Sequence, residues 1–93
     1  MKELNPLLHS QLRLAIMSIL MSVEEADFVY LKEKTESTAG NLSVQLDKLS
    51  SAGYIRVVKG MSGKRPRTTC SVTPDGRAAF EKYVNSLRSY LNL

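Results

Sequence analysis

The hydrophobic period of this chain changes at Gly53, and this change constrains the fold more than any other feature. Before Gly53, apolar residues recur at three- and four-residue steps, as in amphipathic helices. After it, residues 54–59 and 67–72 are rich in aromatic and β-branched side chains, which is typical of strands. Residues 60–66 hold two glycines and a proline and predict a turn. The chain is therefore predicted to be mainly α, with a small β-hairpin.

Two helices are predicted in the first part of the chain. Asn5 and Pro6 are suited to the cap and the first position of a helix, and an apolar stripe continues from there to about Met21. Asp27 is a good cap for a second helix of about eight residues, which ends in the polar run KEKTES.

A third helix is predicted over residues 38–52, and a fourth follows the hairpin. Thr38 caps the third helix, and Gly53 comes after its end, where a left-handed residue costs least. Thr73 caps the fourth helix, with Pro74 at the first helical position. The predicted order is helix, helix, helix, hairpin, helix.

The chain has 93 residues, a length that allows one domain over residues 1–93. A domain of this size buries roughly 60–65% of the surface of its unfolded chain, so its core is marginal and a partner subunit would add stability. The apolar face of the last helix is wider than one small domain needs, and leucines at the start of the first helix would be largely exposed in a monomer. These residues form the predicted homodimer interface: Leu4, Leu7, Leu8, Phe80, Tyr83, Val84, Leu87, Tyr90 and Leu91.

Several classes of protein are excluded by what the sequence lacks. No apolar run reaches the ~20 residues of a membrane span, and the first residues do not resemble a signal peptide. Cys70 is the only cysteine and His9 the only histidine, which excludes an internal disulfide and a zinc site of normal ligand count. We therefore expect a cytoplasmic protein with no membrane association, no metal and no cofactor.

No arrangement of residues supports catalysis. His9 lies near the N-terminus, and a lone histidine is more often a surface or packing residue than a base. Cys70 lies within a strand pattern, where we expect a small buried apolar residue and not a nucleophile. The segment GMSG lacks the spacing and the following helix of a phosphate-binding loop. We therefore predict that the protein is not an enzyme.

Positive charge is concentrated in residues 54–79. This segment has six Lys and Arg residues against one Asp, whereas residues 1–53 have five against seven acidic residues. The net charge of the whole chain is +4. A basic block beside a nearly neutral remainder indicates a polyanion partner, nucleic acid first. A solvated loop with surplus Lys and Arg is the alternative.

The second and third helices, joined by a tight polar turn, have the arrangement of a helix-turn-helix. One face of the third helix holds Leu42, Leu46 and Leu49. The opposite face is rich in small, amide and hydroxyl side chains, which bond to base edges and phosphates; a merely solvated face, which more often carries Glu and Lys, is the alternative. The predicted DNA contacts of this helix are Thr38, Gly40, Asn41, Ser43, Val44, Gln45 and Lys48.

The hairpin follows this helix directly, and its tip is basic. Lys64, Arg65 and Arg67 lie in and around the predicted loop, where they are placed to contact phosphates or the minor groove. A helix-turn-helix followed by a basic hairpin is a more specific signal than either feature alone.

Two runs of sequence carry a resemblance to a known family. NLSVQLDKLSSAGYIRVVK is similar to the recognition helix and first wing strand of winged helix-turn-helix transcriptional regulators of the MarR/ArsR-like superfamily, and KRPRTTCSVTPDGRAAF is similar to their wing and final helix. The chain resembles the compact single-domain branch over nearly its whole length. The resemblance implies a homodimer, usually a repressor, that is joined by its terminal helices and binds double-stranded DNA.

The chain departs from two branches of this superfamily. It lacks the Cys/His clusters of metal-sensing members and the longer terminal helices with which MarR-type members form a ligand pocket, so no small-molecule effector is assigned. We predict a sequence-specific regulator with the recognition helix, residues 38–52, in the major groove and a wing, residues 59–67, on the phosphates. The alternatives are a winged helix that docks a partner protein and a nonspecific nucleoid protein.

Overall fold

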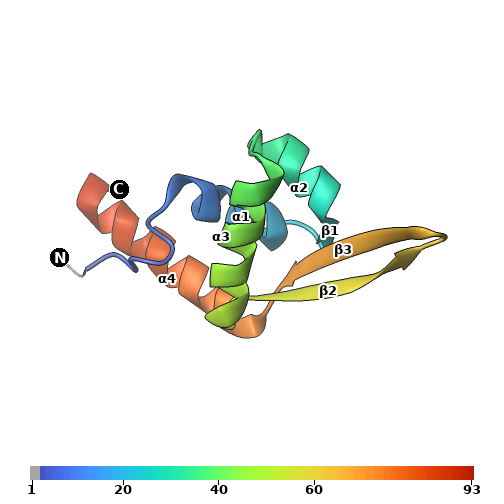
Figure 1. Cartoon of the computed structure of the whole chain (residues 1–93). Coiled ribbons are helices and arrows are strands. Elements are labelled where there is room, and N and C mark those ends of the chain that lie inside the picture. Colours follow the sequence, from blue (N-terminus) through green and yellow to red (C-terminus); the bar gives the residue numbers. More distant parts are fainter. Residues whose placement is uncertain (1–2) are drawn as a thin grey trace.

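Figure 1 shows the computed structural model of the chain, which describes residues 3–93. Its helices are α1 (Gln11–Met21), α2 (Phe28–Thr35), α3 (Ala39–Ser51) and α4 (Pro74–Leu91). The strands β1 (Ala26–Asp27), β2 (Ile55–Ser62) and β3 (Arg65–Val72) form an antiparallel sheet in the order β1-β3-β2. The predicted mainly helical fold class, with a hairpin between the third and fourth helices, is confirmed.

The first helix begins later than Asn5 and Pro6 predict. Asn5 does act as a local cap, because its Oδ1 accepts a hydrogen bond from the backbone N–H of Leu7 at 2.9 Å, but only a turn follows it. At Ser10 the backbone is extended (φ −149°), and Oγ accepts from the backbone N–H of Arg13 at 3.4 Å, so α1 begins at the next residue. The predicted start is wrong because two good capping residues lie close together and the second one caps the helix.

The other three helices begin where their capping residues predict. Asp27, Thr38 and Thr73 each accept a side-chain hydrogen bond from the backbone N–H three residues later. α3 has Ala52 as its C-cap, and Gly53 follows with a φ of +80°, which confirms its predicted left-handed conformation. These helix ends therefore follow from local side-chain chemistry.

The sequence does not predict β1, because two residues show no period. Ala26 pairs with Cys70 and Asp27 pairs with Thr69. β3 is therefore the central strand, and the start of α2 is fastened to the base of the hairpin.

The hairpin is longer, and its turn is tighter, than the sequence predicts. β2 and β3 stay paired up to Ser62 and Arg65, so the connection is Gly63 and Lys64 and not a loop over residues 60–66. Gly63 takes a φ of +63°, the conformation that tight hairpin turns with a leading glycine require.

Pro66 explains why the predicted loop of about seven residues is wrong. A proline normally breaks a central strand because it cannot donate to the ladder. Here β1 pairs only with Thr69 and Cys70, so among the described residues no strand lies beside the outer edge of β3 at Pro66. Pro66 is paired with Met61 on the inner edge, and the strand continues through it.

The helices and both long strands share one hydrophobic core. Leu42, Leu46 and Leu49 are all buried, which confirms the predicted inner face of α3. Burial of a side chain of this size contributes roughly 1.5–3 kcal/mol. No helix within residues 3–93 has the length and apolar character needed to cross a membrane. The largest fully buried side chains are Leu8, Ile16, Met17, Leu20, Leu31, Leu42, Leu49 and Cys70.

Two residues that were predicted for a homodimer interface lie inside this core. Leu8 is fully buried and Tyr83 is 3% exposed, while Leu4 and Leu7 are half-buried against the core. The expectation that these leucines would be largely exposed in a monomer is wrong. The N-terminal segment instead folds back along α4, where Nδ1 of His9 lies 2.9 Å from the hydroxyl of Tyr83 (Figure 1).

The end of α3 and the start of α4 meet at a tight corner, formed by residues 53, 54, 73 and 76. The Tyr54 carbonyl accepts a hydrogen bond from the backbone N–H of Thr73 at 3.0 Å, and the Thr73 hydroxyl donates to the carbonyl of Gly53 at 2.6 Å. Gly76, in the first turn of α4, is buried against the same peptide group, and a Cβ there would lie 1.9 Å from the Tyr54 carbonyl oxygen. Only glycine fits this position without a shift of the backbone.

We expect Gly76→Ala to lower the free energy of unfolding by about 3 kcal/mol, the upper part of the usual range for overpacking. The added methyl group would overlap the Tyr54 carbonyl oxygen, so α4 must move away from the corner. Urea unfolding at a fixed protein concentration, followed by circular dichroism, measures the change.

Gly40→Ala is the matched control for this substitution. A Cβ at Gly40 meets nothing within 4 Å, and alanine is favoured over glycine within a helix by up to about 1 kcal/mol. This variant should therefore be neutral or more stable than the wild type. Equal stabilities for the two variants would show that the corner tolerates a side chain.

Candidate nucleic-acid interface

α2 and α3 form the helix-turn-helix that the sequence predicts. Residues 36–38 join them, and Glu36 ends α2 in the left-handed conformation with a φ of 53°. Both helices pack on α1, and Figure 1 shows α3 crossing in front of it. α3 is thus supported by the core on one side, and its other side faces solvent.

The outward face of α3 is open and carries small polar side chains. Val44 is 50% exposed and offers methyl groups of the kind that contact thymine. The charged residues Asp47 and Lys48 are exposed on this helix, one of each sign. The face is therefore suited to hydrogen bonding more than to charge neutralisation. Six predicted contacts are exposed here: Thr38, Gly40, Asn41, Ser43, Val44 and Lys48.

Gln45 differs from these six residues, because it is half-buried and engaged within the protein. Its Oε1 accepts a hydrogen bond from Nη1 of Arg13, and its Nε2 donates to Oδ1 of Asn41 at 2.9 Å. Both ends of the Gln45 amide are occupied. A bidentate contact from Gln45 to a base such as adenine requires these two bonds to break first.

Arg13 is the residue of this site that sequence reasoning misses. It lies on α1, 32 positions before Gln45, and its Nε also donates to the carbonyl of Leu7 at 2.6 Å. In the sequence, Arg13 has the pattern of an ordinary polar position in an amphipathic helix. Its contact with α3 exists only because α1 packs behind that helix.

The wing, defined as β2, β3 and the turn between them, projects away from the helices. Figure 1 shows it extending to the right beyond α2, and residues 58–67 are all exposed. Lys64 lies in the turn itself, and Arg65 is the first residue of the returning strand. Two positive charges are therefore held at the tip, where a phosphate can approach them freely.

Arg67 lies closer to the base of the wing and has a partner in the same chain. Its Nη2 is 3.6 Å from Oδ2 of Asp27, the residue that caps α2. Both side chains are partly exposed, so this ion pair contributes at most about 1 kcal/mol. The charge of Arg67 is partly neutralised within the protein before any phosphate approaches.

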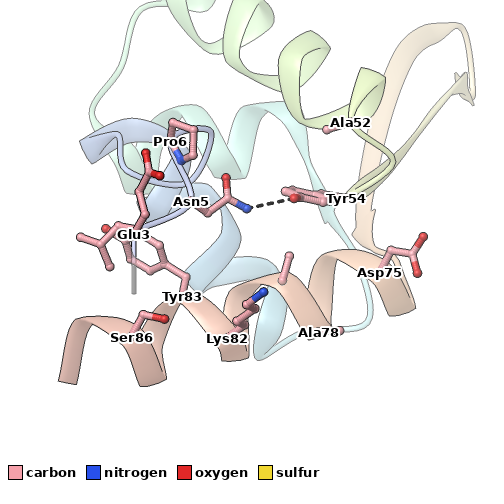
Figure 2. Close-up of a pocket in the computed structure, with 12 residues that line it drawn as sticks. Glu3, Asn5, Pro6, Ala52, Tyr54, Asp75, Ala78, Lys82, Tyr83 and Ser86 are labelled. Atoms are coloured by element: carbon pink, nitrogen blue, oxygen red, sulfur yellow. Dashed lines mark hydrogen bonds between the residues drawn. The ribbon is translucent and has the colours of Figure 1, made fainter. Parts of the chain in front are cut away.

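A half-open groove of about 700 Å³ lies between the N-terminal segment, the corner and α4. In Figure 2 the side chain of Asn5 points across to Tyr54, where Nδ2 donates to the hydroxyl at 3.0 Å. The lining mixes apolar side chains with the charged residues Glu3, Asp75 and Lys82. The groove thus borders the point at which α3 and α4 are joined.

Neither Cys70 nor His9 is arranged as a catalytic group. Cys70 is fully buried in β3, and burial raises the pKa of its thiol from 9.0 to about 11, which confirms its predicted place in the interior. A thiol held in the neutral form is a poor nucleophile. The hydrogen bond between His9 and Tyr83 fastens the N-terminal segment to α4.

Comparisons with known proteins agree with this geometry. The model of a family described as "Winged helix DNA-binding domain" matches residues 12–91. The chain is also 37% identical over 76 residues to the uncharacterized protein MJ0432 of Methanocaldococcus jannaschii, a match that covers 82% of this chain and 83% of that protein.

Solved structures share the fold. A transcriptional regulator homologue from Pyrococcus horikoshii OT3 matches with a TM-score of 0.86 and 27% identity, covering 92% of this chain and 85% of the other. A MarR-family transcriptional regulator from Silicibacter pomeroyi matches in fold with a TM-score of 0.70 and 23% identity, covering 89% of this chain but 55% of the other. The predicted resemblance to winged helix regulators is confirmed.

We expect Cys70 to react about 100-fold or more slowly with a thiol reagent in the folded protein than in the urea-unfolded chain, near pH 8. The raised pKa, from 9.0 to about 11, lowers the thiolate fraction by that factor, and burial restricts access further. The folded-state rate should rise with pH up to about 11, because only the thiolate reacts. The rates in the folded and the unfolded protein are measured with a disulfide reagent that releases a coloured thiolate when it reacts. Equal rates would contradict the burial of the thiol.

Proposed function

Because this chain belongs to the winged helix DNA-binding domain family, we propose that it is a sequence-specific transcriptional regulator, a repressor, that binds double-stranded DNA as a homodimer. α3 enters the major groove, and the wing contacts the phosphate backbone and the adjacent minor groove. The protein performs no chemical reaction on the DNA.

The observation that carries this proposal is the contrast between the two faces of α3. Its inner face is made of buried leucines, whereas Asn41, Ser43 and Val44 are exposed on the outer face. The major groove of B-DNA, about 12 Å wide, admits a helix. Side chains this short allow the helix to approach the base edges closely, and they supply donors, acceptors and a methyl contact.

The wing supplies the charge that this face of α3 lacks. Lys64 and Arg65 are exposed at its tip, and each phosphate that a cation neutralises releases counterions and favours binding. Arg67 is paired with Asp27, which neutralises part of its charge, so we assign it the smaller contribution. In this mode α3 reads the bases, and the wing fixes the protein on the backbone.

We expect the double variant Lys64→Ala/Arg65→Ala to bind all DNA sequences more weakly. The log–log dependence of affinity on salt should become shallower by about 0.9 for each phosphate contact removed. Fluorescence anisotropy measures this slope on a duplex selected from a random DNA pool and on mixed genomic DNA.

Arg77→Ala/Lys82→Ala is the matched control, because it removes the same charge from exposed positions on α4. This control should leave the slope unchanged. An unchanged slope in the wing variant would remove the wing from the interface. Tight binding with no preferred sequence would favour a nucleoid protein, and absence of DNA binding by the wild type would favour a protein-docking winged helix.

The second half of α4 supports the homodimer in this proposal. Val84 and Leu87 are half-buried there, and Leu91 is 58% exposed. This end of the molecule lies opposite the wing (Figure 1), so a two-fold axis here leaves both copies of α3 free. Helix-turn-helix dimers place their recognition helices about 34 Å apart, one turn of DNA. Leu4, Leu7, Phe80 and Tyr90 complete the proposed interface, with Leu8 and Tyr83 supporting it from the core.

We expect Leu91→Glu to convert the homodimer to a monomer. Leu91 is exposed in the single chain, so the substitution charges the interface without disturbing the core. Sedimentation equilibrium near micromolar concentration should give twice the 10.4 kDa chain mass for the wild type and the single mass for the variant.

Val29→Glu, at a position 63% exposed on α2, is the control and should stay dimeric. A wild-type protein that remains at 10.4 kDa as its concentration rises would refute the homodimer. A dimer that persists in Leu91→Glu would place the interface elsewhere.

A further inference from the structure

We infer that Arg13 is a positioning residue for base recognition: it holds the amides of Gln45 and Asn41 in one orientation, so that Asn41 presents its N–H donors to the DNA. This inference rests on the proposed function, because it assumes that α3 reads bases. It adds a residue of α1, outside the helix-turn-helix, to the determinants of sequence preference.

Three hydrogen bonds connect these residues in a chain, which we call the amide relay. Arg13 is half-buried, and its Nε is fixed by the carbonyl of Leu7 at 2.6 Å. Its Nη1 donates to Oε1 of Gln45. Nε2 of Gln45 then donates to Oδ1 of Asn41, one helical turn earlier, at 2.9 Å. The relay runs from α1, which carries Arg13, to the exposed face of α3.

The chemistry of the guanidinium group sets the direction of the relay. A guanidinium has only donors, so the Gln45 atom that faces Arg13 must be the amide oxygen. The amide nitrogen of Gln45 then faces Asn41, and this requires the oxygen of Asn41 to face Gln45. Reversal of either amide would place two N–H groups against each other, or two oxygens. Without Arg13, both amides are free to reverse together.

This orientation determines which hydrogen-bonding group Asn41 presents at the protein surface. Asn41 is exposed, and its Nδ2 group, with two N–H donors, is the part of its amide that the relay leaves free. In the major groove such donors match N7 and O6 of guanine, N7 of adenine and O4 of thymine, and they do not match the amino group of cytosine. We therefore assign to Asn41 a base that offers acceptors, with guanine favoured because both of its edge atoms accept.

The forked geometry of arginine is necessary for this role. Nε and Nη1 serve two acceptors, Leu7 and Gln45, that belong to different segments. A lysine carries its three donors on one atom and does not hold two such acceptors in a fixed planar arrangement. Arg13→Lys therefore keeps the charge and removes the orientation, which separates the relay from a simple phosphate contact.

The relay is tested first in the free protein, by NMR of the side-chain amides of Asn41 and Gln45. In the wild type, hydrogen exchange at the Gln45 amide should be slowed relative to that of an exposed amide such as Asn85. Arg13→Lys and Arg13→Met should both remove this protection. Arg77→Met, which removes an arginine at an exposed position on α4, is the control and should leave it unchanged. Protection that survives in both Arg13 variants would overturn the relay.

The second measurement is the base preference of the same variants on sequences selected from a random DNA pool. Arg13→Lys should reduce discrimination at the base pair read by Asn41 by roughly tenfold, the lower part of the range for one good base contact. Its affinity for random DNA and its salt slope should remain those of the wild type. Arg13→Met should lose the same discrimination.

Two results at this stage would overturn the inference. Equal losses on all sequences in Arg13→Met, with a slope shallower by about 0.9 and full rescue by lysine, would make Arg13 a phosphate contact. Unaltered discrimination in Arg13→Lys, after the amide protection is lost, would show that orientation has no role in reading. Absence of DNA binding by the wild type would instead refute the proposed function, while the NMR result would still decide whether the relay exists.

Discussion

The close contact between Gly76 and the backbone of Tyr54 is the constraint on which the arrangement of the other parts depends. The end of α3, the start of β2, the end of β3 and the first turn of α4 converge there. Thr73 donates hydrogen bonds to the carbonyls of Gly53 and Tyr54. Because a side chain at position 76 would overlap the Tyr54 carbonyl oxygen, α4 can pass directly across the end of α3 only with glycine in place. The recognition helix, the wing and the terminal helix therefore share one corner, and their positions are not independent.

The helical part of the molecule and the wing differ in how far their side chains are buried. The helices enclose a core of leucines, isoleucine and methionine, and this core includes the Cys70 thiol. The wing has no core beyond its base, since residues 58–67 are all exposed. It is held by the ladder between β2 and β3 and by the tight turn at Gly63. A ribbon of this kind contributes little to stability, and it suits the proposed role of carrying charge away from the body.

Charge and hydrogen bonding are divided between the two parts of the candidate interface. Lys64 and Arg65 place positive charge at the tip of the wing, whereas the outer face of α3 is mostly uncharged. Cations bind phosphates whatever the base sequence, so they give affinity without discrimination. Directional amide and hydroxyl groups distinguish bases, provided that their orientation is fixed. In the proposed mode, Arg13 serves that second task from α1, through the fixed geometry of its guanidinium donors and not through its charge.

The sequence by itself determined the features that depend on neighbouring residues. The caps at Asp27, Thr38 and Thr73, the inner leucines of α3, the left-handed Gly53 and the order of helices and hairpin all follow from local chemistry and period. Only the tertiary structure decided the features that depend on residues far apart in the chain. β1 exists because Ala26 pairs with Cys70, and Leu8 is buried because the N-terminal segment folds back along α4. β3 continues through Pro66 because, among residues 3–93, no strand pairs with its outer edge there. The contact of Arg13 with Gln45 joins residues 32 positions apart, and the period of a single helix carries no information about such a pair.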